Sequence, residues 1–115
     1  MCIRDRLKGK LDGMAIRVPT PDVSVIDLVC RLEKDVTVSE VNKAFSNAAN
    51  GALKGVLGVS EEPLVSIDYT GNPHSSIADL KSTMCVSPRM VKVVSWYDNE
   101  MGFSNRMIDM TKHIA

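Results

Sequence analysis

Near the end of the chain, the side chains of Asp98, Asn99 and Glu100 lie between a segment with the composition of a strand and a segment with the apolar spacing of a helix. The run Val93–Tyr97 is rich in β-branched and aromatic residues, and Asp98-Asn99-Glu100 follows it directly. The segment Met101–Ile114 then carries apolar residues at helical spacing. This order predicts a strand-to-helix corner, where the free N–H groups of the first helical turn can meet a polar ligand. The alternative role for Asn99 is an N-cap of that helix, and the two roles are compatible.

Arg17 is the second residue whose type and position could serve chemistry. It lies at the end of a short apolar run, Gly13–Val18, and just before the rigid exit Pro19-Thr20-Pro21. A guanidinium held there presents a planar, permanently charged fork that suits phosphate. From the residues alone, a surface ion pair is the commoner role of an arginine.

The cysteines and histidines predict neither a nucleophile nor a metal site. Cys2, Cys30 and Cys85 are odd in number and widely spaced, which indicates reduced thiols rather than a disulfide framework or a C-x-x-C site. Cys30 and Cys85 lie in apolar strand patterns without a cationic neighbour, so both thiols are expected to be inert. His74 follows Pro73 in a turn, and His113 belongs to the last helical turn, where its charge is favourable. We expect no catalytic residue and no metal ligand in the chain.

The elements around these residues predict an α+β fold: a mostly antiparallel sheet with a helix packed on one face, plus a C-terminal helix. Thr37-Val38-Ser39-Glu40 has the pattern of a capping box at the start of the first helix, and Asn50-Gly51 is expected to end it with a residue that can adopt a positive φ. The expected strands are Gly13–Val18, Val23–Glu33, Leu64–Tyr69, Ser76–Asp79, Thr83–Val86 and Met90–Tyr97.

Within the expected strand Val23–Glu33, alternate residues separate into two faces. Ile26, Leu28, Cys30 and Leu32 form a wholly apolar face that should meet the core. The other face is mixed, and we expect it to meet another subunit or domain.

Length and charge restrict the class of protein. The 115 residues predict one domain. A formal net charge of zero argues against a nucleic-acid or anionic-membrane surface held by bulk charge. No run approaches the length of a membrane span, and no signal peptide is visible, so a cytoplasmic protein is expected.

The corner sequence W-Y-D-N-E, followed by Gly102-Phe103-Ser104-Asn105, closely resembles the end of phosphorylating glyceraldehyde-3-phosphate dehydrogenases. Three further blocks, at 7–21, 54–68 and 72–79, resemble the same family in its order and at about its spacing. The resemblance runs from Leu7 to Ala115. Residues 1–6, MCIRDR, do not fit it and are expected to be a non-native leader.

The resemblance implies a division of the chain and a role for each candidate. Residues 7–98 would be part of the C-terminal catalytic domain, and 99–115 a helix that docks on the NAD-binding domain. Asn99 would bind the nicotinamide carboxamide, because an amide offers both a donor and an acceptor to another amide. Arg17 would bind the phosphate of the substrate or inorganic phosphate. The implied cofactor is NAD, with NADP as the alternative, and the implied assembly is a homotetramer.

The implied activity is the glycolytic oxidation of a small phosphorylated aldehyde with phosphate capture, which gives an acyl phosphate. The family's S-C-T-T-N nucleophile block, its histidine base and its Gly-rich nucleotide fold do not occur in these 115 residues. The chain alone is therefore expected to be inactive. Met101 and Phe103 depart from the family, which usually has a bulky aromatic (or Thr) and a Tyr there. Some blocks also resemble erythrose-4-phosphate dehydrogenase, and a non-enzymatic oligomerisation or interaction module is the alternative from another class.

Overall fold

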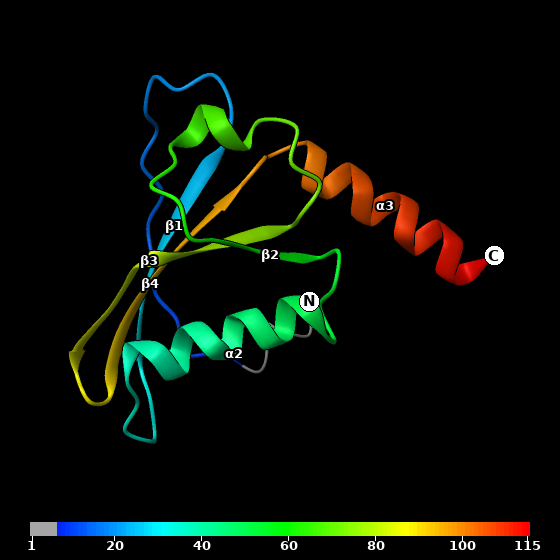
Figure 1. Cartoon of the computed structure of the whole chain (residues 1–115). Helices are drawn as coiled ribbons and strands as arrows, with labels where there is room; N and C mark the ends of the chain where they lie inside the picture. Colours follow the sequence, from blue (N-terminus) through cyan, green and yellow to red (C-terminus); the bar gives the residue numbers. More distant parts are fainter. Residues whose placement is uncertain (1–6) are drawn as a thin grey trace.

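A computed structural model of the chain describes residues 7–115 (Figure 1). Its four strands form one sheet in the order β1-β4-β3-β2. β4 pairs antiparallel with both β1 and β3, whereas the short β2 runs parallel to β3. This confirms the predicted α+β fold with a mostly antiparallel sheet. The elements are β1 (Ser24–Arg31), α2 (Val38–Asn50), β2 (Leu57–Ser60), the 3-10 helix η1 (Ser66–Tyr69), β3 (Ser76–Ser87), β4 (Met90–Tyr97) and α3 (Met101–Ile114).

Helix α2 covers one face of the sheet and η1 lies over the other (Figure 1). The capping box that starts α2 is confirmed: the Glu40 N–H donates to the Thr37 hydroxyl at 3.3 Å, and the Glu40 carboxylate accepts from the Thr37 N–H at 2.8 Å. Gly51 ends the helix as predicted, and its φ is −115°, so it does not use the positive φ that glycine allows. A Cβ at Gly51 would lie 2.9 Å from the Asn47 carbonyl oxygen, and this close approach is what requires glycine there.

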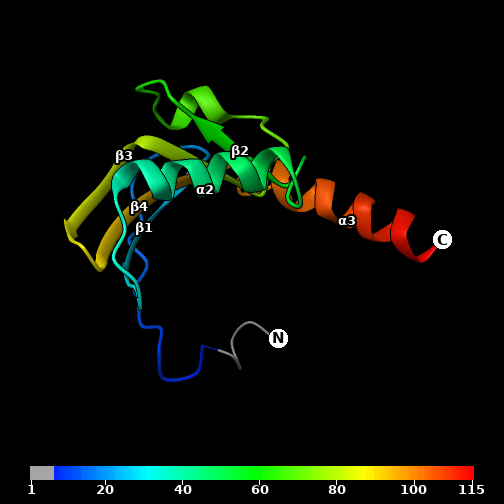
Figure 2. The ribbon, with the colours of Figure 1, turned by 60° about the horizontal axis from the view of Figure 1, so that its bottom comes forward.

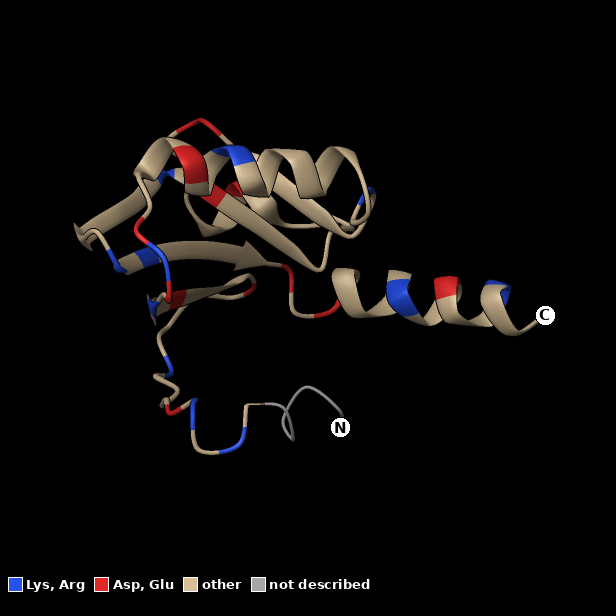
Figure 3. Cartoon of the chain, turned by 90° about the horizontal axis from the view of Figure 1, so that it is seen from below, with Lys and Arg blue, Asp and Glu red and all other residues tan. Residues whose placement is uncertain are grey.

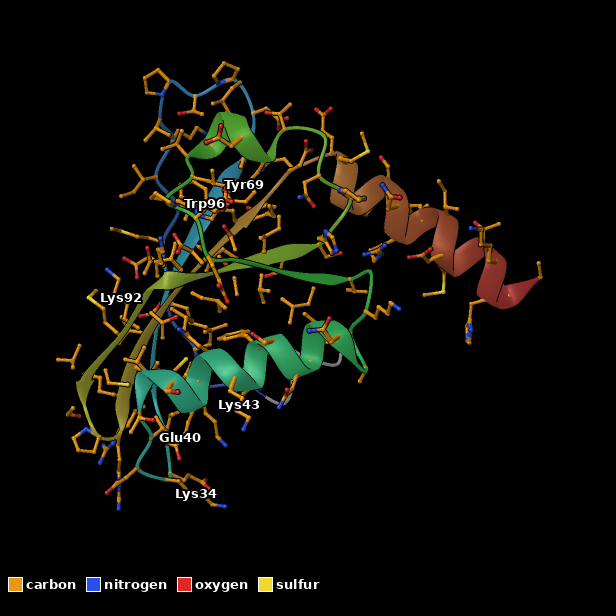
Figure 4. All side chains as sticks on the ribbon, in the orientation of Figure 1. Lys34, Glu40, Lys43, Tyr69, Lys92 and Trp96 are labelled. Atoms are coloured by element: carbon orange, nitrogen blue, oxygen red, sulfur yellow. The ribbon has the colours of Figure 1, made fainter. Side chains whose placement is uncertain are left out.

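The core is small and lies under η1. Val23, Tyr69 and Ile77 are buried together, with Leu64 and Trp96 packed against them. The rings of Tyr69 and Trp96 stack with centroids 5.6 Å apart and an interplanar angle of 17° (Figure 4). This cluster fixes the end of the sheet where β4 leads into α3.

The predicted strand Gly13–Val18 is wrong. Residues 11–18 have no regular structure and run away from the sheet (Figure 2). The apolar side chains of the segment lie in solvent, with Met14 87% and Ile16 72% exposed. A strand forms when its backbone finds a partner and one side is buried, and neither condition holds for this segment in the described part of the chain.

Two other strand predictions need correction. The segment Leu64–Tyr69 ends in η1 instead, because the Asp68 carboxylate accepts from the Val65 N–H at 2.8 Å and curls the backbone. The parallel strand β2 was not predicted. The two strands expected at 76–79 and 83–86 are one continuous β3 with a bulge, where the Asp79 carboxylate accepts from the backbone N–H groups of Lys81 and Ser82.

Strand β1 agrees with the predicted strand at 23–33 but not with its predicted burial. Ile26 is 50% and Leu28 36% exposed on the face that was expected to meet the core. On the other face, Val25 and Val29 are exposed as well. The reason is the position of β1 at the edge of the sheet, since α2 packs on β2 and β3.

The C-terminal helix α3 is confirmed in its predicted bounds and projects away from the sheet (Figure 1). Gly102 is its one buried residue. The predicted apolar stripe is exposed to solvent and comprises Phe103, Met107, Met110 and Ile114.

Candidate functional site

The corner between β4 and α3 is organised by Asp98, which is buried. One of its carboxylate oxygens, Oδ1, accepts from the N–H groups of Glu100 at 2.9 Å and Met101 at 2.7 Å, and the other accepts from the Gly71 N–H at 2.8 Å. Hydrogen bonds from the N–H groups of Met101, Gly71 and Glu100 lower the pKa of Asp98 to about 2. The carboxylate therefore remains charged at neutral pH and holds the start of α3.

Asn99 does not cap the helix, so that alternative role is wrong: the side chain that satisfies the first N–H groups is Asp98. Asn99 is exposed, and its amide lies against the Ser24 hydroxyl at the start of β1. The Nδ2 atom is 2.7 Å and the Oδ1 atom 3.1 Å from Ser24 Oγ. A primary amide has two N–H groups and two oxygen lone pairs. One N–H and one lone pair of Asn99 therefore remain available to a ligand.

The residue before Ser24 is strained. Val23 has φ = +64°, a left-handed conformation that is a genuine outlier for a β-branched residue and costs about 1–3 kcal/mol. Its N–H donates to the Asp22 carboxylate at 2.7 Å, and its side chain is buried in the core. The core thus holds a strained backbone immediately before the hydroxyl that contacts Asn99.

The loop before β3 contacts and hydrogen-bonds the first turns of α3. A Cβ at Gly102 would lie 2.8 Å from the His74 carbonyl oxygen, so helix and loop are in close backbone contact. The Arg106 guanidinium donates to the Gly55 carbonyl and the Ser75 hydroxyl, each at 3.2 Å. The ring and the N–H of His74 both contact the Asn72 amide oxygen, at 2.8 and 3.0 Å. His74 therefore has a structural role in this loop.

The structure does not bring Arg17 to this corner. Arg17 is exposed in the irregular segment before β1, and within residues 7–115 it makes no side-chain hydrogen bond or ion pair. Two shallow surface hollows of the described part lie elsewhere. One, of about 570 Å³, lies between the start of α2 and the β3–β4 turn, and the other, of about 860 Å³, lies beside α2.

Cys30 and Cys85 are free thiols on β1 and β3, as predicted from their strand patterns. Both lie opposite Val91 of β4, one on each side of it. In the part of the chain that the structure describes, no cluster of His, Cys, Asp or Glu is suited to a metal ion. None of the helices formed by residues 7–115 has the length and apolar character to cross a membrane. Lys and Arg are interspersed with Asp and Glu along the ribbon (Figure 3).

Two residues of the corner escaped the sequence reasoning. Asp98 was noted only as one of two carboxylates, although an aspartate just before a helix is a common capping signal. Ser24 gave no local signal, since its partner Asn99 is 75 residues away and becomes a neighbour only through the pairing of Ser24 with Tyr97.

Comparison with known proteins agrees with the resemblance in the sequence. Residues 2–99 match the family model of the glyceraldehyde 3-phosphate dehydrogenase C-terminal domain. The chain is 63% identical to a glyceraldehyde-3-phosphate dehydrogenase of Geobacillus stearothermophilus over 109 residues. This alignment covers 95% of the chain and 32% of that relative. Identity to the Priestia megaterium enzyme of that name is 62%, with the same coverage. The sequence identity to glyceraldehyde-3-phosphate dehydrogenase 1 of Bacillus subtilis is 61%, again over 95% of the chain and 32% of the relative.

The chain spans about a third of the length of these curated relatives. The family-model match covers most of the chain, and the mixed sheet and two helices are consistent with an α+β domain of that kind. The chain therefore belongs to the glyceraldehyde-3-phosphate dehydrogenase family, as a part of its C-terminal domain.

Proposed function

We propose that the chain serves as the C-terminal part of an NAD-dependent, phosphorylating glyceraldehyde-3-phosphate dehydrogenase. The whole enzyme would oxidise an aldehyde: hydride passes from the substrate to the nicotinamide, and inorganic phosphate takes the acyl group. Aldehyde, NAD⁺ and phosphate would yield acyl phosphate, NADH and a proton. Homotetrameric assembly and a cytoplasmic location belong to the same proposal, and NADP is the alternative cofactor.

The observation that carries this proposal is the presentation of Asn99. Its amide is exposed at a corner that Asp98 stabilises with three backbone hydrogen bonds, and Ser24 holds it on one side. The N–H of Asn99 that Ser24 does not engage can donate to the oxygen of a nicotinamide carboxamide.

The role of Arg17 in this proposal is to bind phosphate. Its guanidinium is exposed and is not engaged by any acidic side chain of residues 7–115, which leaves the fork free for an anion. The nucleophile and base of the proposed reaction would come from sequence outside these 115 residues. The chain by itself is therefore proposed to be inactive.

A chimera tests the proposal. Residues 7–115 would replace the matching C-terminal third of the Geobacillus stearothermophilus relative, and NADH formation would be followed with glyceraldehyde 3-phosphate and inorganic phosphate. We expect an active chimera in which Asn99→Ala raises the KM for NAD and Arg17→Gln raises the KM for phosphate, each about tenfold or more. A correctly folded but inactive chimera would contradict the proposal. So would phosphate-dependent NADH formation by the 115-residue chain alone.

Two alternatives have distinct outcomes in the same experiment. A fragment of erythrose-4-phosphate dehydrogenase would give a chimera whose kcat/KM is higher for erythrose 4-phosphate. A non-enzymatic interaction module is favoured by the exposed apolar side chains of β1 and α3. That module would leave the chimera inactive, while the isolated chain would associate with itself or with full-length subunits in sedimentation measurements.

A further inference from the structure

We propose that Ser24 is a positioning residue for Asn99: its hydroxyl holds the Asn99 amide in place for the carboxamide of the ligand. This inference rests on the proposed function, because it assumes that Asn99 receives such a ligand. Ser24 itself would not touch the reacting atoms.

The geometry places one hydroxyl against both polar atoms of the amide. Ser24 Oγ lies 2.7 Å from Asn99 Nδ2 and 3.1 Å from Asn99 Oδ1. An exposed asparagine without a partner samples several rotamers, and ordering it on binding would reduce affinity. A contact already present in the free protein removes part of that cost.

The contact fixes the position of the amide but not its direction. A hydroxyl both donates and accepts, so Ser24 can hold the amide in either of its two flipped orientations. In each orientation Ser24 engages the edge where the amide N–H and oxygen lie side by side, so the N–H on the other side of the amide is the donor left for a ligand carboxamide oxygen. A carboxylate or an ammonium group at position 24 would hold one orientation alone.

Ser24 is in turn placed by features that a simple surface contact would not need. It pairs with Tyr97 at the last register position shared by β1 and β4, which brings it beside the residues that follow β4. The backbone immediately before it is held at φ = +64° in Val23, and the Val23 side chain is locked in the core with Tyr69 and Ile77. Strain that is retained directly next to a proposed ligand contact is a common mark of a functional position.

The test uses the chimera described above, with the variants Ser24→Ala, Ser24→Thr, Asn99→Ala and the double variant Ser24→Ala/Asn99→Ala. We expect Ser24→Ala to raise the KM for NAD about fivefold, the loss of one hydrogen bond, with kcat changed less than twofold. Ser24→Thr keeps the hydroxyl and should restore the original KM. The double variant should be no worse than Asn99→Ala, because Ser24 would act only through Asn99.

Ser39→Ala is the matched control, since Ser39 is an exposed serine on α2 away from the corner. A purely structural effect of Ser24→Ala would lower the thermal midpoint and kcat without a selective change in KM, and that result would overturn the inference. If Asn99→Ala raises the KM but Ser24→Ala does not, Ser24 has no positioning role while the proposed function stands. If Asn99→Ala itself leaves the KM unchanged, the proposed function fails, and this inference with it.

A second measurement does not depend on the chimera. In the ¹⁵N-labelled 115-residue chain, the side-chain amide of Asn99 should give a resolved pair of resonances that shifts on Ser24→Ala and returns with Ser24→Thr. An Asn99 amide signal that is the same in all three proteins would overturn the contact on which the inference depends.

Discussion

The carboxylate of Asp98 and the backbone N–H of Gly71, 27 residues apart in the sequence, are joined by a 2.8 Å hydrogen bond. The same carboxylate caps the first turn of α3. One buried side chain therefore ties together the end of β4, the turn after η1 and the start of the last helix. Asn99, the proposed ligand contact, is the residue that directly follows Asp98.

Replacement of Asp98 by Asn should destabilise the fold. The amide oxygen can still accept from the start of α3, but its NH₂ group cannot accept from the N–H of Gly71 and would leave that donor unsatisfied. We expect a loss of about 2–3 kcal/mol in the free energy of unfolding, measured by urea denaturation of the chain. Asp12→Asn is the control, because Asp12 is exposed and, among residues 7–115, its carboxylate accepts only from the adjacent Gly13 N–H. Equal stability of both variants would contradict this account of Asp98.

The charge of Asp98 should also make stability depend on pH in the acid range. Its pKa is lowered from 3.8 to about 2 in the folded chain, so the charged form is favoured by folding. The resulting stabilisation, about 2 kcal/mol, is fully present above about pH 5 and is lost as the pH falls toward 2. Urea denaturation between pH 5 and 2 should show this loss in the original chain and a smaller loss in Asp98→Asn. If the free energy of unfolding fell equally with pH in both proteins, the acid-range loss of stability would not come from Asp98.

Gly102→Ala should separate α3 from the loop before β3. Alanine is the better helix former by about 1 kcal/mol, yet its Cβ would lie 2.8 Å from the His74 carbonyl oxygen. That contact is with backbone and cannot be relieved by a rotamer change, so we expect a net loss of about 1–3 kcal/mol. Hydrogen exchange of the α3 amides gives a local measurement. Gly13→Ala, where a Cβ meets nothing within 4 Å, is the control and should leave stability and exchange unchanged.

Tyr69→Phe should be neutral or stabilising, by up to about 1 kcal/mol. Tyr69 is 3% exposed, and its hydroxyl has no hydrogen-bond partner among residues 7–115. Removing an unsatisfied buried hydroxyl removes its desolvation cost, while the ring can still stack on Trp96. Thermal unfolding of the chain measures the effect. A loss of 1 kcal/mol or more would mean that the hydroxyl has a partner in solution, such as a bound water.

Thr37→Ala should destabilise α2 by about 1 kcal/mol, because it removes the hydroxyl that accepts from the Glu40 N–H. Thr37→Ser keeps this oxygen and serves as the matched control. The helical signal in circular dichroism, followed through a urea transition, distinguishes the two. If the serine variant is as unstable as the alanine variant, the packing of the threonine methyl group matters more than the cap.

The sequence predicted the elements whose signals are local. The capping box at Thr37 set the start of α2, and the 3.6-residue spacing of Phe103, Met107 and Met110 set α3. Prediction from the sequence failed where an element depends on pairing with residues that are distant in the chain. β2 is a four-residue strand that exists through its parallel pairing with β3, and the apolar run at 13–18 has no partner among the described residues.

In the candidate site, too, the residue with a local sequence signal was predicted and the residue placed by strand pairing was not. Asn99 was identified from its position after a strand and before a helix, together with the family resemblance. Its partner Ser24 could not be found, since their contact depends on the register between β1 and β4. Val23 read as an ordinary strand residue, because a hydrophobic pattern carries no information about a positive φ.

The outer edge of β1 has a consequence for the chain in concentrated solution. This strand of eight residues has β4 on one side, and its Val25, Ile26, Leu28 and Val29 side chains are exposed. Such an edge is a template on which identical strands of other molecules can add and begin a cross-β aggregate. Asp27, the one charge within residues 25–30, interrupts this apolar run as a gatekeeper, because its carboxylate, in an ion pair with Lys92 at 2.8 Å, is costly to bury between stacked sheets.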